Sequence, residues 1–424
     1  LSIRRQRQMC IRDRPIIKSL LDTDYYKLTM LNCFYYYENA VPVTYKFKCR
    51  NKDVKFTENM IELIAEQIEH VCQLKLTKDE AIYLRSIPNF NESFVRFMED
   101  LTLRATDVKM NLNNEGVLDI TIKGPVIYTS LWEIYLLSIV NEVYFGSFYN
   151  YDKTSEQYRE YVESGLDTLN NKLKSVEHIA GFTFSEFGTR RRFSRDYHEL
   201  VIKRLIESKQ CVGTSNVDFA RRYNLKPIGT MAHEWIMFHM GLTHMNKANK
   251  LAMDRWQEFY EGDLGTALTD TITTDYFLKS FNGTLARAFD GWRHDSGDPV
   301  EWTNKMINHC KKLNVDYKNK LFLYSDGLDF SDAVDIYMQF VTVLNKISFG
   351  IGTRITNDIP GLKPLNIIIK MVECNKFPTI KLSDSPGKIM CEDKVFADWA
   401  EHFYRGNYIT TSDMTKENSS HNCE

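Results

Sequence analysis

The sequence lacks the features that would place it outside the cytoplasm or around a cysteine-rich metal centre. Its nine cysteines, an odd number, are scattered from Cys10 to Cys423 and include no CxxC pair and no cysteine–histidine metal spacing. Such usage is typical of free thiols in a reducing compartment rather than of a disulfide framework. Because no cleavable signal peptide is visible either, we expect a cytoplasmic protein.

Strong net charge and long apolar runs are also lacking. A formal net charge of −2 gives no electrostatic reason to expect binding to nucleic acid or to an anionic membrane. The most apolar stretch, residues 131–145, is interrupted by Glu133, Asn141 and Glu142 and is too short to span a bilayer. We predict that it forms a buried helix.

What is present is an ordinary globular composition over 424 residues, with 43% hydrophobic and 26% charged residues. This length predicts two or three domains, or one large domain with an appendage. Residues 1–14 hold five arginines and no apolar core, and we interpret them as a non-native or disordered extension. Residues 410–424 form a polar tail.

The two ends of the chain predict an α+β domain, made from residues 15–125 together with 365–409. Helical patterns cover 16–37, 59–74 and 78–87, and strand patterns cover 43–49, 107–112 and 117–123. Asp22 or Thr23 is suited to cap the first helix. Residues 367–373 and 379–382 predict a hairpin that returns to the N-terminal strands.

Residues 126–364 predict an α/β domain, because short apolar runs alternate with helical patterns. The runs are 181–185, 226–229, 267–271, 289–293, 321–324 and 346–349. Such alternation predicts parallel strands joined by helical crossovers. Most runs end in charged or glycine-rich residues, which favours a barrel whose site is built from the loops after the strands. A doubly wound open sheet is the structural alternative.

The sequence KPIGTMAHEW at residues 226–235 is the leading candidate site. We predict a short buried strand, a turn, and then a helix whose first turn carries His233. A helix N-terminus suits a phosphate, and an imidazole nitrogen is a competent nucleophile. The alternative is a histidine that only packs against the core or caps the helix.

Two further motifs follow predicted strands. The sequence FGTRRR at 187–192 places three consecutive arginines at the mouth of the site, where their guanidinium groups suit phosphate or carboxylate oxygens. A solvated helix start is the alternative for this run. Ser215, in GTSN at 213–216, is a candidate N-cap, and that structural role is the alternative to any functional one.

Acidic and glycine-rich strand ends complete the set. In WRHDSGDP at 292–299, Asp295 and Asp298 flank a turn and are suited to hold a ribose diol or hydrated Mg²⁺, although Asp298-Pro299 is also a helix-start signal. Asp326 ends the next strand beside a glycine. The sequence SFGIGTR at 348–354 offers glycine backbone and a threonine hydroxyl to a terminal phosphate. Together these motifs predict an enzyme that handles a phosphorylated, pyrophosphorylated sugar.

In chain order these motifs resemble the nicotinate phosphoribosyltransferase family, as do LDTDYYK at 21–27, VGTSN at 212–216 and KLSDSPGK at 381–388. The resemblance covers residues 15–403. It implies a type II phosphoribosyltransferase, with an irregular α/β barrel packed on an α+β domain built from both chain ends. It also implies conversion of nicotinate and phosphoribosyl pyrophosphate to nicotinate mononucleotide and pyrophosphate. The reaction would use Mg²⁺, and ATP hydrolysis would be coupled to it through a phosphorylated His233.

The resemblance also implies roles for individual residues. Tyr26 and Phe187 would sandwich the pyridine ring, and either Arg190 or Arg293 would pair with the nicotinate carboxylate or a phosphate. Asp295 and Asp326 would steady ribose hydroxyls or Mg²⁺. The remaining candidates are Thr230 for substrate and Gly350, Gly352 and Thr353 for the 5′-phosphate. Family members commonly pair two subunits, with the tyrosine of the N-terminal motif entering the neighbour's site, so a homodimer is a candidate state.

Ser215 bears on the choice of substrate. Related nicotinamide enzymes carry an aspartate at the comparable place, which would repel a carboxylate, so the serine favours nicotinate. Quinolinate phosphoribosyltransferase is an alternative of related architecture, but it uses no phosphohistidine, and the motif around His233 argues against it. The non-enzymatic alternative is an inactive interaction scaffold, against which stands the fact that every candidate position is filled.

Overall fold

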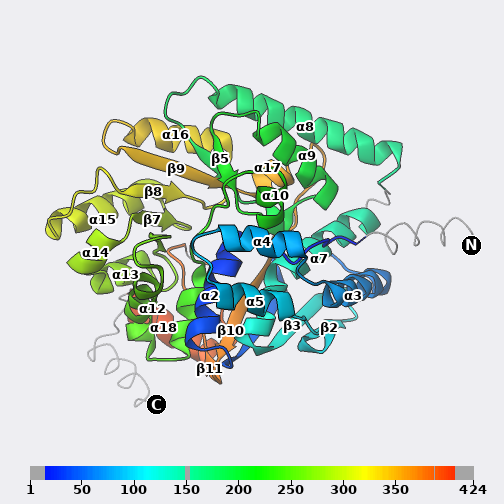
Figure 1. The fold of residues 1–424 in the computed structure, drawn as a ribbon, viewed down its shortest axis with the longest axis horizontal. Coiled ribbons are helices and arrows are strands. Elements are labelled where there is room, and N and C mark those ends of the chain that lie inside the picture. Colours follow the sequence, from blue (N-terminus) through cyan, green and yellow to red (C-terminus); the bar gives the residue numbers. More distant parts are fainter. Residues whose placement is uncertain (1–14, 149–152, 386, 406–424) are drawn as a thin grey trace, which may run out of the picture.

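The structure is a computed structural model that describes residues 15–148, 153–385 and 387–405. The predicted extension at 1–14 and the predicted tail at 410–424 lie outside these residues. Figure 1 shows two groups of strands, one at the lower part of the molecule and one at the upper left, each accompanied by helices. No helix within the described ranges is both long enough and apolar enough to cross a membrane.

One sheet is antiparallel and joins strands from both ends of the chain. Its order is β11-β10-β1-β3-β2. The strands are β1 (Pro42–Cys49), β2 (Val108–Leu112), β3 (Leu118–Pro125), β10 (Ile367–Cys374) and β11 (Phe377–Pro378). The central strand β1 pairs with β3 on one side and with β10 on the other, where Val43 lies opposite Cys374. The predicted return of the C-terminal hairpin to the N-terminal strands is therefore confirmed.

The helices beside this sheet follow capping and burial signals in the sequence. They are α2 (Tyr25–Tyr37), α3 (Glu58–Gln73), α4 (Lys78–Ser86), α5 (Glu92–Asp100), α6 (Val126–Thr129) and α7 (Trp132–Phe148). A capping box between Thr77 and Glu80 starts α4. The predicted buried helix is confirmed, because Trp132 and Tyr135 of α7 are fully buried.

The second sheet is parallel, with the order β5-β4-β9-β8-β7-β6. Its strands are β4 (Phe184–Glu186), β5 (Cys211–Thr214), β6 (Thr266–Leu268), β7 (Gly291–His294), β8 (Leu321–Tyr324) and β9 (Lys346–Ile351). The predicted α/β class is thus confirmed. Among the described residues, β5 and β6 stand at the two ends of the strand order, so closure of this sheet into a barrel stays a prediction.

Helices connect the parallel strands and bring their carboxyl ends to one edge, where the polar residues gather. The connecting helices are α9 (Arg195–Leu205), α10 (Val217–Arg222), α11 (His233–Met240), α12 (Met245–Tyr260), α13 (Thr274–Ser280), α14 (Gly283–Ala288), α15 (Pro299–Lys312) and α16 (Phe330–Phe340). The helix α8 (Glu156–Val176) precedes the first strand of this sheet, and α17 (Thr353–Thr356) and α18 (Lys394–Arg405) follow the last. The helix start predicted at Asp298-Pro299 is confirmed, since Asp298 accepts from two backbone N–H groups at the start of α15.

Three local predictions are wrong, and one strand was not expected. Residues 226–229 form a single bridge, Pro227 to Thr214, and no strand, because proline has no N–H for a ladder. The strand that was not expected is β5, which precedes α10 and ends at Thr214, the partner in this bridge. The first helix begins at Tyr25 and not at residue 16, and its N-cap is Asp24. The second strand of the C-terminal hairpin is β11 and not 379–382, because positive φ angles at Asn375 and Lys376 turn the chain at once.

Candidate active site

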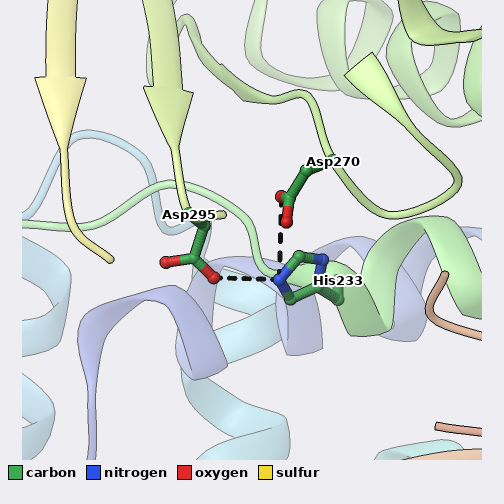
Figure 2. Close-up of side chains that lie close together, drawn as sticks. All are labelled: His233, Asp270 and Asp295. Carbon is green, nitrogen blue, oxygen red and sulfur yellow. Dashed lines mark hydrogen bonds and ion pairs between the residues drawn. The ribbon is translucent and has the colours of Figure 1, made fainter. Parts of the chain in front are cut away.

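His233 is the first residue of α11 and is almost completely buried. Its Nε2 lies 2.9 Å from Asp295 Oδ2 at the end of β7 and 3.9 Å from Asp270 Oδ1, which follows β6. Its Nδ1 lies 3.0 Å from the Thr271 hydroxyl. Figure 2 shows both carboxylates directed at the same imidazole nitrogen. The histidine predicted to begin the helix is therefore held by groups from two neighbouring strand ends.

The electrostatic setting of His233 favours a neutral imidazole. Burial lowers its pKa to about 4, assisted by the ammonium of Lys381 and opposed by Asp270 and Asp295. Because a carboxylate only accepts hydrogen bonds, the Nε2 atom carries the proton toward Asp295. A neutral imidazole keeps a lone pair at neutral pH, which a nucleophile requires.

Asp270 and Lys381 are functional candidates that sequence reasoning missed. Lys381 Nζ lies 3.4 Å from Asp270 Oδ2 and 3.9 Å from Asp295 Oδ2. The backbone N–H of Leu382 donates to Thr271 O at 2.9 Å, which fixes this segment beside the histidine. The sequence held signals for both residues, since Asp270 lies near the end of the predicted strand 267–271 and Lys381 is the first residue of the KLSDSPGK motif.

The carboxylates beside His233 differ in their hydrogen bonding. Burial tends to raise the pKa of Asp295, but the hydrogen bond to His233 and the charges of Arg293 and Lys381 hold it well below its usual value. Asp270 Oδ2 accepts from Ser296 Oγ at 2.5 Å. Asp270 Oδ1, in contrast, is buried and has no hydrogen-bond partner in the described part of the chain. Together with His233, these two carboxylates form a group close enough to share one ion.

Asp326 is not part of this group. Its two carboxylate oxygens each lie 2.8 Å from Lys388 Nζ, so Asp326 already has an ion-pair partner within the protein. It is nevertheless adjacent, because the neighbouring Ser325 donates to Asp295 Oδ1 at 2.9 Å. The structure therefore places Asp326 next to the residues around His233 without direct contact to the imidazole.

The three consecutive arginines do not share one role, and the prediction that all three line the mouth of the site is wrong. Arg192 is fully buried and pairs with both oxygens of Asp22 at 2.7 and 2.9 Å. Arg191 is tied to the backbone carbonyl of Ile367 at 3.0 Å. Asp22 is thus an ion-pair partner and not the predicted helix cap.

Arg190 alone of the three keeps an uncommitted guanidinium. It is half-buried and makes no hydrogen bond or ion pair with any other described residue. Burial tends to lower its pKa, but the nearby phenol of Tyr26 and the carboxyls of Glu133, Asp24 and Asp295 raise it above its usual value. A half-buried cation without a bonded partner is suited to receive an anionic ligand.

The two rings predicted to clamp the substrate come from separate elements, Tyr26 from the first turn of α2 and Phe187 from the residue after β4. Gly229 allows the backbone of Tyr26 to approach, since a β-carbon there would lie 3.0 Å from Tyr26 N. A β-carbon at Gly350 would overlap the Phe187 ring. Within the described residues neither Tyr26 nor Phe187 stacks on another aromatic ring. A flat ligand would therefore displace no aromatic neighbour from either ring.

The glycines of the predicted phosphate loop have a packing role. Gly350 makes room for the Phe187 ring, and Gly352 lies against the Phe187 carbonyl, where a β-carbon would be 2.8 Å from the oxygen. Thr353 begins the four-residue helix α17. Whether these groups also bind phosphate stays a prediction.

The remaining predicted residues are held by hydrogen bonds within the protein. The hydroxyl of Ser215 donates to Asp24 Oδ1 at 2.7 Å, and Asn216 rather than Ser215 caps the next helix, so the predicted capping role is wrong. Thr230 Oγ1 donates to Thr266 O at 2.7 Å. Arg293 Nη1 donates at 3.2 Å to the carbonyl of Met231, which lies two residues before His233.

Comparison with known proteins agrees with this geometry. The sequence model described as the nicotinate phosphoribosyltransferase (NAPRTase) family matches residues 182–407, and that of the family's N-terminal domain matches residues 21–141. Relatives named nicotinate phosphoribosyltransferase from Shigella boydii and Escherichia coli are 41% identical over 389 residues, 90% of this chain and 94% of theirs.

Solved structures agree as well. Nicotinate phosphoribosyltransferase from Vibrio cholerae is 35% identical, with a TM-score of 0.85 over 96% of this chain and 97% of that one. The Porphyromonas gingivalis protein of the same name is 34% identical, with a TM-score of 0.83 over 92% and 100% of the two chains. The chain therefore belongs to the nicotinate phosphoribosyltransferase family.

Proposed function

We propose that this protein transfers phosphoribosyl from phosphoribosyl pyrophosphate to nicotinate, and that ATP hydrolysis drives the transfer through a phosphate carried by His233. The observation that carries the proposal is the buried, neutral His233 held by Asp295 beside Lys381. An uncommitted arginine, Arg190, supports a substrate with a carboxylate. The family to which the chain belongs supports the same substrates.

Phosphoryl transfer is the first step. The lone pair of the imidazole attacks the γ-phosphorus of ATP, a nitrogen–phosphorus bond forms, and the phosphorus–oxygen bond to ADP breaks. The imidazole gains positive charge as it reacts, and the Asp295 carboxylate at 2.9 Å stabilises that charge. The ammonium of Lys381, 3.4 Å from Asp270, and the N–H groups that begin α11 would attract the phosphate oxygens. Hydrolysis of the phosphohistidine later returns the free imidazole.

Glycosyl transfer needs no general base. The pyridine nitrogen of nicotinate attacks C1′ of the ribose, the carbon–oxygen bond to pyrophosphate breaks, and its electron pair leaves with the pyrophosphate. Catalysis then rests on positioning and on charge stabilisation. Arg190 pairs with the nicotinate carboxylate, while Tyr26 and Phe187 hold the ring by stacking. Ser215, fixed by Asp24, places no charge of its own against that carboxylate.

The two polyphosphate substrates would bring Mg²⁺, and His233 lies between two carboxylates that could hold it. Asp270 Oδ1, which lacks a hydrogen-bond partner among the described residues, and the Asp295 carboxylate provide the oxygen ligands that Mg²⁺ prefers. Bound there, the ion would neutralise phosphate charge. The carboxylate of Asp326 and the hydroxyl of Thr230 remain candidates for contacts to the ribose, as Gly350, Gly352 and Thr353 do for its 5′-phosphate.

Three broader expectations belong to the same proposal. Residues 15–125 with 365–409 form one domain and residues 126–364 the other, which the shared antiparallel sheet supports. The protein acts in the cytoplasm. It pairs as a homodimer, although Tyr26 already lies within electrostatic range of Arg190 in its own chain.

The proposal is tested by the initial rate of nicotinate mononucleotide formation from nicotinate, phosphoribosyl pyrophosphate and Mg²⁺, with and without ATP. We expect product formation that rises with ATP. Parallel assays with nicotinamide and quinolinate supply the controls, and a preference for either would contradict the proposal. An equal rate without ATP would keep the transferase and remove the phosphohistidine.

A further inference from the structure

A buried lysine joins two carboxylates beneath the site. The side chain of Lys27 is fully buried, and its ammonium lies 2.6 Å from Glu133 of α7 and in ion-pair contact with Glu234 of α11. Glu234 also accepts from the Tyr45 hydroxyl at 2.5 Å, and Glu133 lies 3.6 Å from the ammonium of Lys370. Two lysines and two glutamates thus form a compact group without net charge.

Two residues of this group are direct sequence neighbours of residues proposed to act in the site. Lys27 directly follows Tyr26 on α2, and Glu234 directly follows His233 on α11. The carboxylate of Glu133 acts on Arg190, where it helps to hold the pKa of the guanidinium high. One ammonium is therefore linked to the phosphate acceptor on one side and to the proposed nicotinate contacts on the other.

Stability alone gives no strong reason for such a group. Burying an ion pair costs several kcal/mol of desolvation for each ion, and an apolar replacement of the same volume is often equally stable. What a buried pair does impose is geometry, because sliding α2 against α11 would leave Lys27 or Glu234 unpaired in a medium of low dielectric constant.

We propose that Lys27 is a positioning residue that couples the phosphorylation state of His233 to the Tyr26–Arg190 side of the site. The inference rests on the proposed function. A phosphate on His233 brings a charge of roughly −1.5 to −2 next to Glu234. That charge repels the Glu234 carboxylate, and the Lys27 ammonium moves with its ion-pair partner. The ion pair between Lys27 and Glu133 changes as a result. The field at Arg190 changes with it, so that ATP use and nicotinate binding are linked.

The test removes one charge of each sign. In the double variant Lys27→Met with Glu234→Gln, Glu133 keeps Lys370 as its partner, and no net charge is left behind. The control is Lys46→Met with Asp119→Asn, which likewise removes one lysine and one carboxylate of an ion pair, here 3.2 Å apart and at the surface. The readout is the ratio of ADP formed to nicotinate mononucleotide formed, together with thermal melting of each variant.

We expect the double variant to raise this ratio about fivefold or more, the lower range of typical coupling between two sites. The control variant and Lys27→Arg, which retains the charge, should keep the wild-type ratio. A purely structural role would slow both reactions equally and leave the ratio unchanged, which would overturn the inference.

A second variant decides the matter if the double variant does not fold. Tyr45→Phe removes one hydrogen bond from Glu234 and changes no charge. A raised ratio in this variant supports the coupling, and a wild-type ratio contradicts it. If the wild-type enzyme forms no nicotinate mononucleotide, the proposed function is overturned and the inference with it. If the wild type forms product and the double variant has the same ratio of ADP to nicotinate mononucleotide, the inference alone is overturned.

Discussion

Replacing Asp295 with asparagine tests the charge that faces His233. The substitution keeps the shape of the side chain and removes the negative charge that lies 2.9 Å from His233 Nε2. A hydrogen bond to a charged group contributes roughly 1.5–3 kcal/mol, and each 1.4 kcal/mol changes a rate about tenfold. If that contribution is made in the transition state of phosphoryl transfer, the rate of His233 phosphorylation should fall by about 10- to 150-fold.

The assay is a rapid-quench measurement of acid-labile phosphohistidine formed from ATP that is labelled in its γ-phosphate. Ser325→Ala is the matched control, because it removes the other hydrogen bond of Asp295, 2.9 Å long, and leaves the charge in place. We expect a small effect from the control. A phosphorylation rate in Asp295→Asn within about twofold of wild type would refute the assigned role of the carboxylate.

Three further predictions concern neighbouring residues. Ser215→Asp places a second carboxyl beside Asp24 and opposite the substrate carboxylate, so kcat/KM for nicotinate should fall at least about tenfold, and an unchanged value at low substrate would exclude the role of Ser215. Arg192→Leu strips Asp22 of its bidentate partner and should cost about 3 kcal/mol or more in urea unfolding, while a loss below about 1 kcal/mol would contradict this. The imidazole of His233 should titrate near pH 4 by NMR, with His233→Asn to assign the signal, and titration near 6.5 would disprove the buried neutral state. Because the unfolded chain takes up this proton near pH 6.5, the free energy of unfolding should decrease as the pH falls from 6.5 to about 4.

The sequence pattern predicted the elements that apolar runs define by themselves. Strand β8 at Leu321–Tyr324 lies where it was expected, as do β1, β9 and the buried helix α7. The errors occur where tertiary contacts determine the start or end of an element. Residues 16–24 share the apolar character of α2, yet Asp22 is drawn out of a helical start by its pairing with Arg192.

The candidate site shows the same division. A motif at a strand end predicts which residues gather, and His233 and Asp295 do meet. It does not reveal the partner that another loop supplies, as Lys381 is supplied here. Nor does the run of arginines show that Arg190, alone of the three, has no partner among the described residues, because the partners of the other two, Asp22 and Ile367, lie far away in the sequence.

The most direct test of the account is nicotinate mononucleotide formation with and without ATP, measured for the wild type and for His233→Asn. We predict that ATP stimulates the wild type, that label from the γ-phosphate is found on His233, and that the variant loses both the label and the stimulation. Equal ATP stimulation in the His233→Asn variant would contradict the account, because the phosphate would then have to act at some other place.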